Sequence, residues 1–133
     1  MITISDTALF ASGKATVKPE SKQLATAISG MLQEFPDYDI VVSGHTDNIP
    51  ISNSSYESNW DLSSDRALQF MKILLTNAKL DPQKFTPVGY GEYHPIVDNS
   101  TAVNRAKNRR VEVSLIRKYQ EFNEALDVTV VQD

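Results

Sequence analysis

Residues 38–51 read YDIVVSGHTDNIPI, an apolar run that ends in four adjacent polar side chains. The first half, residues 38–44, has the length and the β-branched residues of a buried strand. The second half places His45–Asn48 just before Pro50. Polar residues at the end of a strand suit a catalytic site, a metal site, a tight turn or a ligand-binding loop. The segments on either side of this strand decide the fold class and narrow the choice.

Apolar residues recur with helical spacing both before and after this strand. The two sets are Leu24, Ala27, Ile28, Met31, Leu32 and Phe35, and Ala67, Phe70, Met71, Leu74, Leu75 and Ala78. Each set predicts a helix with one buried apolar stripe. Pro19 suits the first turn of the first helix, and Pro36 stops it. Ser63 or Ser64 is a candidate cap for the second helix, which LDP at 80–82 ends.

Three further segments have the character of strands, namely ITIS (2–5), FTPVGYG (85–91) and RRVEVSLIR (109–117). In the last of these, Val111, Val113 and Leu115 face one way, and the residues between them face the other. Pro87 cannot donate a ladder hydrogen bond, so its strand is expected at a sheet edge. The order of elements predicts an α/β (α+β) fold, a two-layer sandwich with helices packed on one face of a mixed β-sheet.

The composition narrows the class of protein. A chain of 133 residues with 41% hydrophobic and 23% charged residues suits one globular domain. The net charge of -4 argues against a nucleic-acid partner, and the absence of cysteine excludes disulfides and thiolate chemistry. No segment is apolar enough for a membrane helix, and no signal peptide opens the chain. We therefore expect Met1 to begin an excised domain, with any anchor upstream.

The sequence offers few groups for catalysis or for a cofactor. His45 and His94 are the only histidines, and neither belongs to a zinc motif. There is no GxSxG elbow, and GYGE at 89–92 lacks the GxGxxG fingerprint, so it predicts a turn. We expect no metal, no cofactor and no enzymatic activity. His45 is expected to make local hydrogen bonds.

Asp47 and Arg66 are the strongest candidates for a binding site. Asp47 follows the strand directly, and Arg66 is expected in the first turn of the second helix. A cation there opposes the helix dipole, and a residue that breaks a local rule is a candidate for function. The alternative is that Arg66 pairs with Asp47 or Asp65 and holds the loop in place.

Four blocks in chain order resemble the OmpA-like peptidoglycan-binding domain. They are GHTDNIPI (44–51), SNWDLSSDRA (58–67), GYGEYHP (89–95) and NRAKNRRVEVSL (104–115), and LFASGKATVKPES (9–21) is also similar to that family. Within the family, HTDN followed by IPI, a serine-rich insertion and SNW resembles the periplasmic domain of the flagellar stator subunit MotB. The domain is expected at residues 1–118, with a C-terminal tail or short extra element at 119–133.

The resemblance implies that Asp47 and Arg66 bind the diaminopimelate residue of a peptidoglycan stem peptide. Its far end carries an ammonium and a carboxylate on one carbon, which suit Asp47 and a bidentate Arg66. The same resemblance places Asn59, Leu62 and Ser63 around the pocket, with Thr46 supporting the loop. Arg109 and Arg110 fall in a block near the site, and the pattern does not say which of them faces the ligand.

The resemblance also implies partners and a location. It predicts a non-enzymatic anchor of a flagellar motor stator, on the periplasmic or extracytoplasmic face of the cell membrane. Its implied partners are peptidoglycan, a second copy in a homodimer, and the stator's membrane channel subunit. The last requires an upstream transmembrane segment, so the full-length protein is expected to be a single-pass membrane protein. Two alternatives stay open, a general OmpA-like envelope tether and a wall hydrolase that uses Asp47 with Glu92 or Asp61.

Overall fold

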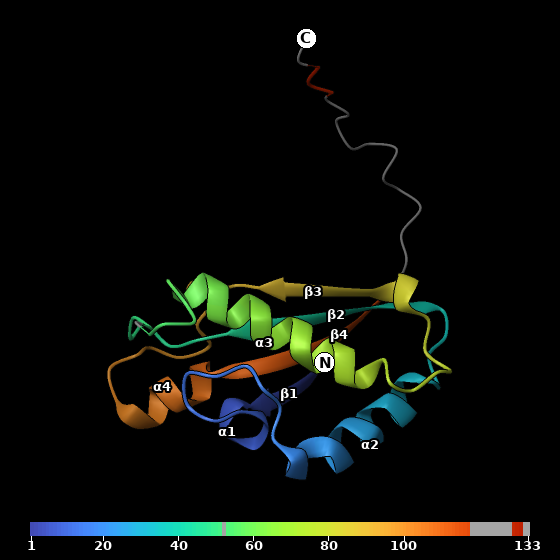
Figure 1. Cartoon of the computed structure of the whole chain (residues 1–133), viewed down its shortest axis with the longest axis horizontal. Helices are drawn as coiled ribbons and strands as arrows, with labels where there is room; N and C mark the ends of the chain where they lie inside the picture. The colour runs from blue at the N-terminus through green and yellow to red at the C-terminus, as the bar shows by residue number, and fades with distance from the viewer. Residues whose placement is uncertain (52, 118–128, 132–133) are drawn as a thin grey trace.

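The computed structural model describes residues 1–51, 53–117 and 129–131. Within these residues, four strands form one sheet in the order β1-β4-β2-β3. Their bounds are Ile2–Ser5 for β1, Tyr38–His45 for β2, Phe85–Gly89 for β3 and Arg110–Arg117 for β4. Strands β2 and β3 are parallel, and β4 runs antiparallel to β1 and β2. The mixed sheet, covered on one face by helices, confirms the predicted fold class (Figure 1).

The strand directions bring distant residues to one edge of the sheet. Strands β1, β2 and β3 run the same way, so their C-terminal ends lie together where antiparallel β4 begins. Arg110, the first residue of β4, is opposite Ser5 on one side and His45 on the other. The polar residues that follow β1 and β2, and those that precede β4, therefore converge at this edge.

The first predicted helix exists, but it buries a different face from the one expected. A 3-10 turn, Pro19–Ser21, leads into α2, Lys22–Leu32. The buried residues of α2 are Ala25, Ile28, Ser29 and Leu32. The predicted stripe was wrong at Leu24, Ala27, Met31 and Phe35, which are exposed. Helix α2 packs against α3, and the hydroxyl of Ser29 donates to the carbonyl of Leu74.

The second predicted helix begins earlier and ends earlier than expected. Helix α3 spans Asn59–Leu74, so neither Ser63 nor Ser64 caps it and Arg66 lies in its middle. The conflict between Arg66 and the helix dipole is therefore absent. One continuous face of α3 is buried; its members are Asn59, Leu62, Ser63, Arg66, Ala67, Phe70 and Leu74. The polar half of this face lacks the apolar periodicity on which the prediction rested.

Two short helices complete the polar edge, and neither was predicted. Helix α1, Asp6–Leu9, follows β1 directly, and α4, Ala102–Asn108, leads into β4. Figure 1 shows α1 and α4 at the same end of the molecule as the beginning of α3. A second 3-10 turn, Pro82–Lys84, precedes β3. As Pro87 predicted, β3 lies at an edge of the sheet, where β2 is its one partner among the described strands.

Two glycines let α3 lie directly on the sheet. A Cβ atom at Gly44 of β2 would overlap the carbonyl oxygen of Ser63, and one at Gly89 of β3 would overlap Ser64. Below this contact the core contains Val42, Phe70 and Val113, which are fully buried. The predicted alternation of β4 is confirmed, because Val111 and Val113 are buried and Ile116 is exposed. The close approach fixes the position of α3 over the polar edge.

The predicted tail at 119–133 lies mostly outside the described residues, because residues 118–128 and 132–133 are not among them. Val130 and Val131, which are described, are exposed. The boundary at residue 118 stays a prediction. Within the described part of the chain, no helix has both the length and the apolar character to cross a membrane.

Candidate functional site

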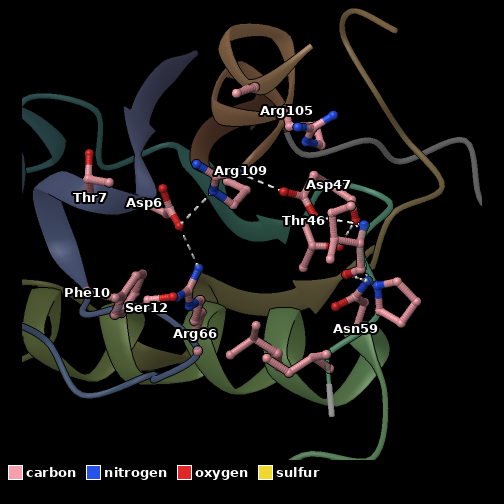
Figure 2. Close-up of a pocket in the computed structure, with 16 residues that line it drawn as sticks. Asp6, Thr7, Phe10, Ser12, Thr46, Asp47, Asn59, Arg66, Arg105 and Arg109 are labelled. Atoms are coloured by element: carbon pink, nitrogen blue, oxygen red, sulfur yellow. Dashed lines mark hydrogen bonds and ion pairs between the residues drawn. The ribbon is translucent and has the colours of Figure 1, made fainter. Parts of the chain in front are cut away.

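A cavity of about 460 Å³ opens at the polar edge of the sheet (Figure 2). Its walls come from α1 and the turn after it, the loop after β2, the buried face of α3, and α4. The charged residues in its lining are Asp6, Asp47, Arg66, Arg105 and Arg109. The remaining lining is mostly apolar or uncharged, with Phe10, Ile49, Pro50 and Leu62 among its members. Three arginines against two aspartates make the lining net positive.

Four of these charged side chains form one alternating series (Figure 2). Nη1 of Arg66 lies 3.2 Å from Oδ2 of Asp6, and Nε of Arg109 lies 3.3 Å from the same oxygen. Nη1 of Arg109 then donates to Oδ2 of Asp47 at 2.7 Å. The series Arg66–Asp6–Arg109–Asp47 joins α3, α1, the junction between α4 and β4, and the loop after β2. Each charge is compensated by a neighbour, as buried charges must be.

Arg66 is the most enclosed of the charged groups, with a relative exposure of 4%. Its Nε donates to the carbonyl of Lys14 and its Nη2 to that of Ala11, and the guanidinium lies 4.7 Å from the centroid of the Phe10 ring. Burial lowers the pKa of Arg66, while Asp6 opposes that shift. A guanidinium has five N–H donors, and the three bonds to Lys14, Asp6 and Ala11 leave one N–H on each Nη.

Asp47 is held in a fixed orientation by the loop it belongs to. Its Oδ1 accepts from the backbone N–H of Ile49 at 2.9 Å, a local turn that Asp favours. The hydroxyl of Thr46 donates to the carbonyl of Asp47, and the amide of Asn59 donates to the carbonyls of Asp47 and Ile49. A carboxylate has about four acceptor positions, so Asp47 retains acceptor capacity for a ligand cation.

The structure brings six of the eight predicted site residues to this cavity. The six are Thr46, Asp47, Asn59, Leu62, Arg66 and Arg109. Ser63 lies below it, fully buried, where its oxygen accepts from the N–H of Gly91 and its hydroxyl donates to the carbonyl of Trp60. Arg110 does not line it either. Direct pairing of Arg66 with Asp47 or Asp65 is also wrong, because the aspartate it contacts is Asp6.

Arg110 lies on the opposite face of the sheet because successive strand residues alternate. There its Nε contacts Glu112 at 2.8 Å, and its Nη2 donates to the carbonyl of His94. His45 shares this face, with Nε2 3.2 Å from Glu112 and its ring stacked on Tyr90. Burial, followed by the positive charge of Arg110, lowers the pKa of His45 to about 4. The expected local hydrogen bonding of His45 is confirmed by its contact with Ser43.

Sequence reasoning missed Asp6 and did not single out Arg105. Asp6 directly follows the strand ITIS, and Asp47 lies just beyond the strand YDIVVSG. Because these two strands run in the same direction, their C-terminal ends, and with them the two aspartates, lie at one edge of the sheet. Arg105 precedes Arg109, the C-cap residue of α4, by four positions, and the lining of the cavity includes both. Both signals are present in the sequence once the strand directions are known.

The other carboxylates considered for chemistry lie elsewhere. Oε1 of Glu92 accepts from the Asn59 amide at 3.4 Å, and Asp61 accepts from the hydroxyl of Ser58. Neither is among the cavity lining residues. Over the ranges the structure describes, no group of three or more histidine, aspartate or glutamate side chains could hold a metal ion.

Comparison with known proteins agrees with this architecture. A family model described as OmpA family matches residues 9–109. Motility protein B of Bacillus subtilis is 51% identical over 125 residues, which cover 93% of this chain and 48% of that protein. The chain spans about half the length of the curated relatives it matches.

Solved structures show the same fold. The cell wall anchor of the T6SS from Pseudomonas aeruginosa superimposes with a TM-score of 0.80 at 36% identity, covering 87% of this chain and 80% of that one. The periplasmic domain of Helicobacter pylori MotB gives a TM-score of 0.82 at 25% identity, covering 92% of this chain and 78% of that one.

Proposed function

Because this chain belongs to the OmpA family, we propose that it is a non-covalent peptidoglycan-binding domain. The observation that carries the proposal is the cavity that holds Asp47 and Arg66 together in fixed orientations. Binding without catalysis suits this site, because the four charged groups of the series Arg66–Asp6–Arg109–Asp47 are compensated by one another.

The ligand we propose is the diaminopimelate residue of a stem peptide. Its zwitterionic end carries a carboxylate for the two remaining N–H groups of Arg66 and an ammonium for the carboxylate of Asp47. The two residues come from α3 and the loop after β2, and Arg109 lies between them through its contacts with Asp6 and Asp47. Charge-assisted hydrogen bonds of this kind contribute about 1.5–3 kcal/mol each. Removal of one partner from a buried pair costs about 2–5 kcal/mol.

Co-sedimentation with purified sacculi tests this function. The wild-type chain should pellet with sacculi that contain diaminopimelate and stay in the supernatant with lysine-type sacculi, which lack the second carboxylate. Arg66→Lys is a better test than alanine, since lysine keeps the charge that Asp6 requires but loses bidentate geometry. A folded wild-type chain that pellets with neither wall, or equally with both, contradicts the proposed ligand.

The relatives support an anchor of a flagellar motor stator as the larger role. The 51% identity to Motility protein B supports this choice, and with it we propose a location on the extracytoplasmic side of the cell membrane. The proposed partners are then peptidoglycan, a second copy of the chain, and a membrane channel subunit reached through an upstream segment. A general envelope tether is the second candidate, favoured by the likeness to a cell wall anchor from a secretion system.

Complementation separates the two roles. A full-length stator subunit whose wall-binding domain is replaced by residues 1–133 should restore swimming in a strain that lacks its own domain. Arg66→Lys in the same fusion should abolish swimming while the fusion still accumulates. A fusion that binds the wall but does not restore motility supports the tether instead.

A further inference from the structure

Among the described residues, one cation of the cavity takes part neither in the proposed diaminopimelate contacts nor in an ion pair. Arg105 is half-buried in the lining, and its Nη1 donates to the carbonyl of Asn99 at 3.0 Å. Among the described residues it makes no ion pair, whereas Arg66 and Arg109 share Asp6, and Arg109 also contacts Asp47. Arg105 therefore supplies the excess positive charge of this lining.

The position of Arg105 follows from helix α4. Arg105 and Arg109 are one turn apart, and the backbone N–H of Arg109 bonds to the carbonyl of Arg105. Both side chains reach the cavity from this side, while Arg66 reaches it from α3 (Figure 2). A ligand carboxylate at Arg66 thus leaves the donors of Arg105 unused at a separate point of the wall.

We propose that Arg105 forms a second anion subsite, which binds a carboxylate of the ligand other than the one at Arg66. This inference rests on the proposed function. The stem peptide up to diaminopimelate has two candidates for this group, the α-carboxylate of the γ-linked D-glutamate and the carboxylate at the L-centre of diaminopimelate. Both present the same chemistry, and either loses its charge when it is converted to a carboxamide; the carboxylate at the L-centre is free only where the stem ends at diaminopimelate. The domain therefore distinguishes a stem peptide with this carboxylate free from one in which it is amidated.

Calorimetric titration with three synthetic peptides tests the subsite. The first is L-Ala-γ-D-Glu-meso-diaminopimelate with all carboxylates free. The second has a carboxamide on D-glutamate, and the third has a carboxamide on the L-centre of diaminopimelate. Loss of a charge-assisted hydrogen bond at a partly exposed group raises Kd about tenfold, so one of the two amides should bind about tenfold more weakly than the free acid. The amidated peptide that binds more weakly identifies which carboxylate occupies the subsite.

Arg105→Gln supplies the decisive comparison, since glutamine can still donate to the carbonyl of Asn99. It should bind the acid and both amides with equal affinity. Lys107→Gln makes the same change in charge at an exposed position of α4 and should keep the wild-type discrimination. A purely structural role of Arg105 would weaken all three peptides by the same factor.

The outcomes separate this inference from the proposed function. Equal binding of all three peptides by the wild type, or unchanged discrimination in Arg105→Gln, overturns the second subsite and leaves peptide binding intact. If the wild-type chain binds none of the three peptides, the proposed function is overturned, and the second subsite with it.

Discussion

Asp6 and Arg66 are 60 residues apart in sequence, and their side chains meet at 3.2 Å at the floor of the cavity. The same aspartate contacts Arg109, so one carboxylate compensates two arginines from different elements. Because Asp6 directly follows β1, its contacts with Arg66 and Arg109 hold the end of the first strand against the binding site.

Loss of this carboxylate should destabilise the protein. Asp6→Asn leaves Arg66 buried without its counter-charge, and we expect the free energy of unfolding to fall by about 2–4 kcal/mol. Urea denaturation followed by circular dichroism measures the change. Glu34→Gln removes an exposed carboxylate from the turn after α2 and should shift the midpoint little. Equal stability of the two variants would show that the Asp6–Arg66 contact does not support the fold.

Arg109 and Arg110 should have separable effects. Arg110 is buried against Glu112 on the far face, so Arg110→Gln should lower the free energy of unfolding by about 2–4 kcal/mol. Arg109 is half-exposed, so Arg109→Gln should cost only about 1 kcal/mol of stability. Its wall binding should fall sharply, because Asp6 and Asp47 would then repel an incoming carboxylate. Thermal unfolding and co-sedimentation together measure both effects, and weaker binding by the folded Arg110→Gln variant than by Arg109→Gln would contradict the assignment of faces.

Glycine should be required at position 44 and dispensable at position 30. In Gly44→Ala the new methyl group meets the backbone of Ser63, and we expect a loss of about 2 kcal/mol or more as α3 moves off the sheet. Gly30 is an exposed position of α2 with nothing near its Cβ, so Gly30→Ala should stabilise by up to about 1 kcal/mol. Melting temperatures that shift in the same direction for both would contradict the close packing.

His45 should make stability depend on pH in the acid range. Its pKa is lowered to about 4 in the folded protein, from an ordinary value of 6.5. Below that ordinary value the unfolded chain binds a proton that the folded chain does not, so stability present at pH 7 is lost as the pH falls toward 4. The groups that face the ring are Arg110, Glu112, Tyr90 and His94.

The expected loss between pH 7 and pH 5 is about 1–2 kcal/mol. Urea denaturation at each pH measures it, and His45→Gln should reduce the dependence, whatever its own stability. His94→Gln, at an exposed histidine, should keep nearly the wild-type slope. An unchanged slope in His45→Gln would assign the effect to other groups.

The sequence predicts the sheet well because its strands are short, alternating or apolar, and bounded by Pro, Gly and Asp. Val111 and Val113 show the period-2 pattern, and Pro87 correctly indicates an edge strand. Helix α3 is harder, since its first two turns bury Asn59, Ser63 and Arg66 in a polar site rather than in a core. Helical periodicity detects only apolar stripes, so the predicted helix begins where the polar residues of the site end.

The site could be predicted only in part, for a physical reason. Asp47 and Arg66 stand out by motif, but their neighbours depend on how the strands pair. Asp6 gains its role because β1 runs parallel to β2 on the other side of β4, a long-range arrangement that local sequence does not encode. Arg109 and Arg110 are equivalent in sequence, and strand alternation alone separates them. Helix α4 has no apolar stripe that would have revealed Arg105.

The central claim is that Asp47 and Arg66 together bind a zwitterion, and two matched peptides test it most directly. We would titrate the chain with L-Ala-γ-D-Glu-meso-diaminopimelate and with the same peptide carrying L-lysine in the last position. The lysine peptide keeps the ammonium and lacks only the carboxylate for Arg66. We expect it to bind about thirtyfold more weakly or worse, which corresponds to about 2 kcal/mol or more. Equal affinity for the two peptides would contradict the claim, because Arg66 would then contribute nothing to recognition.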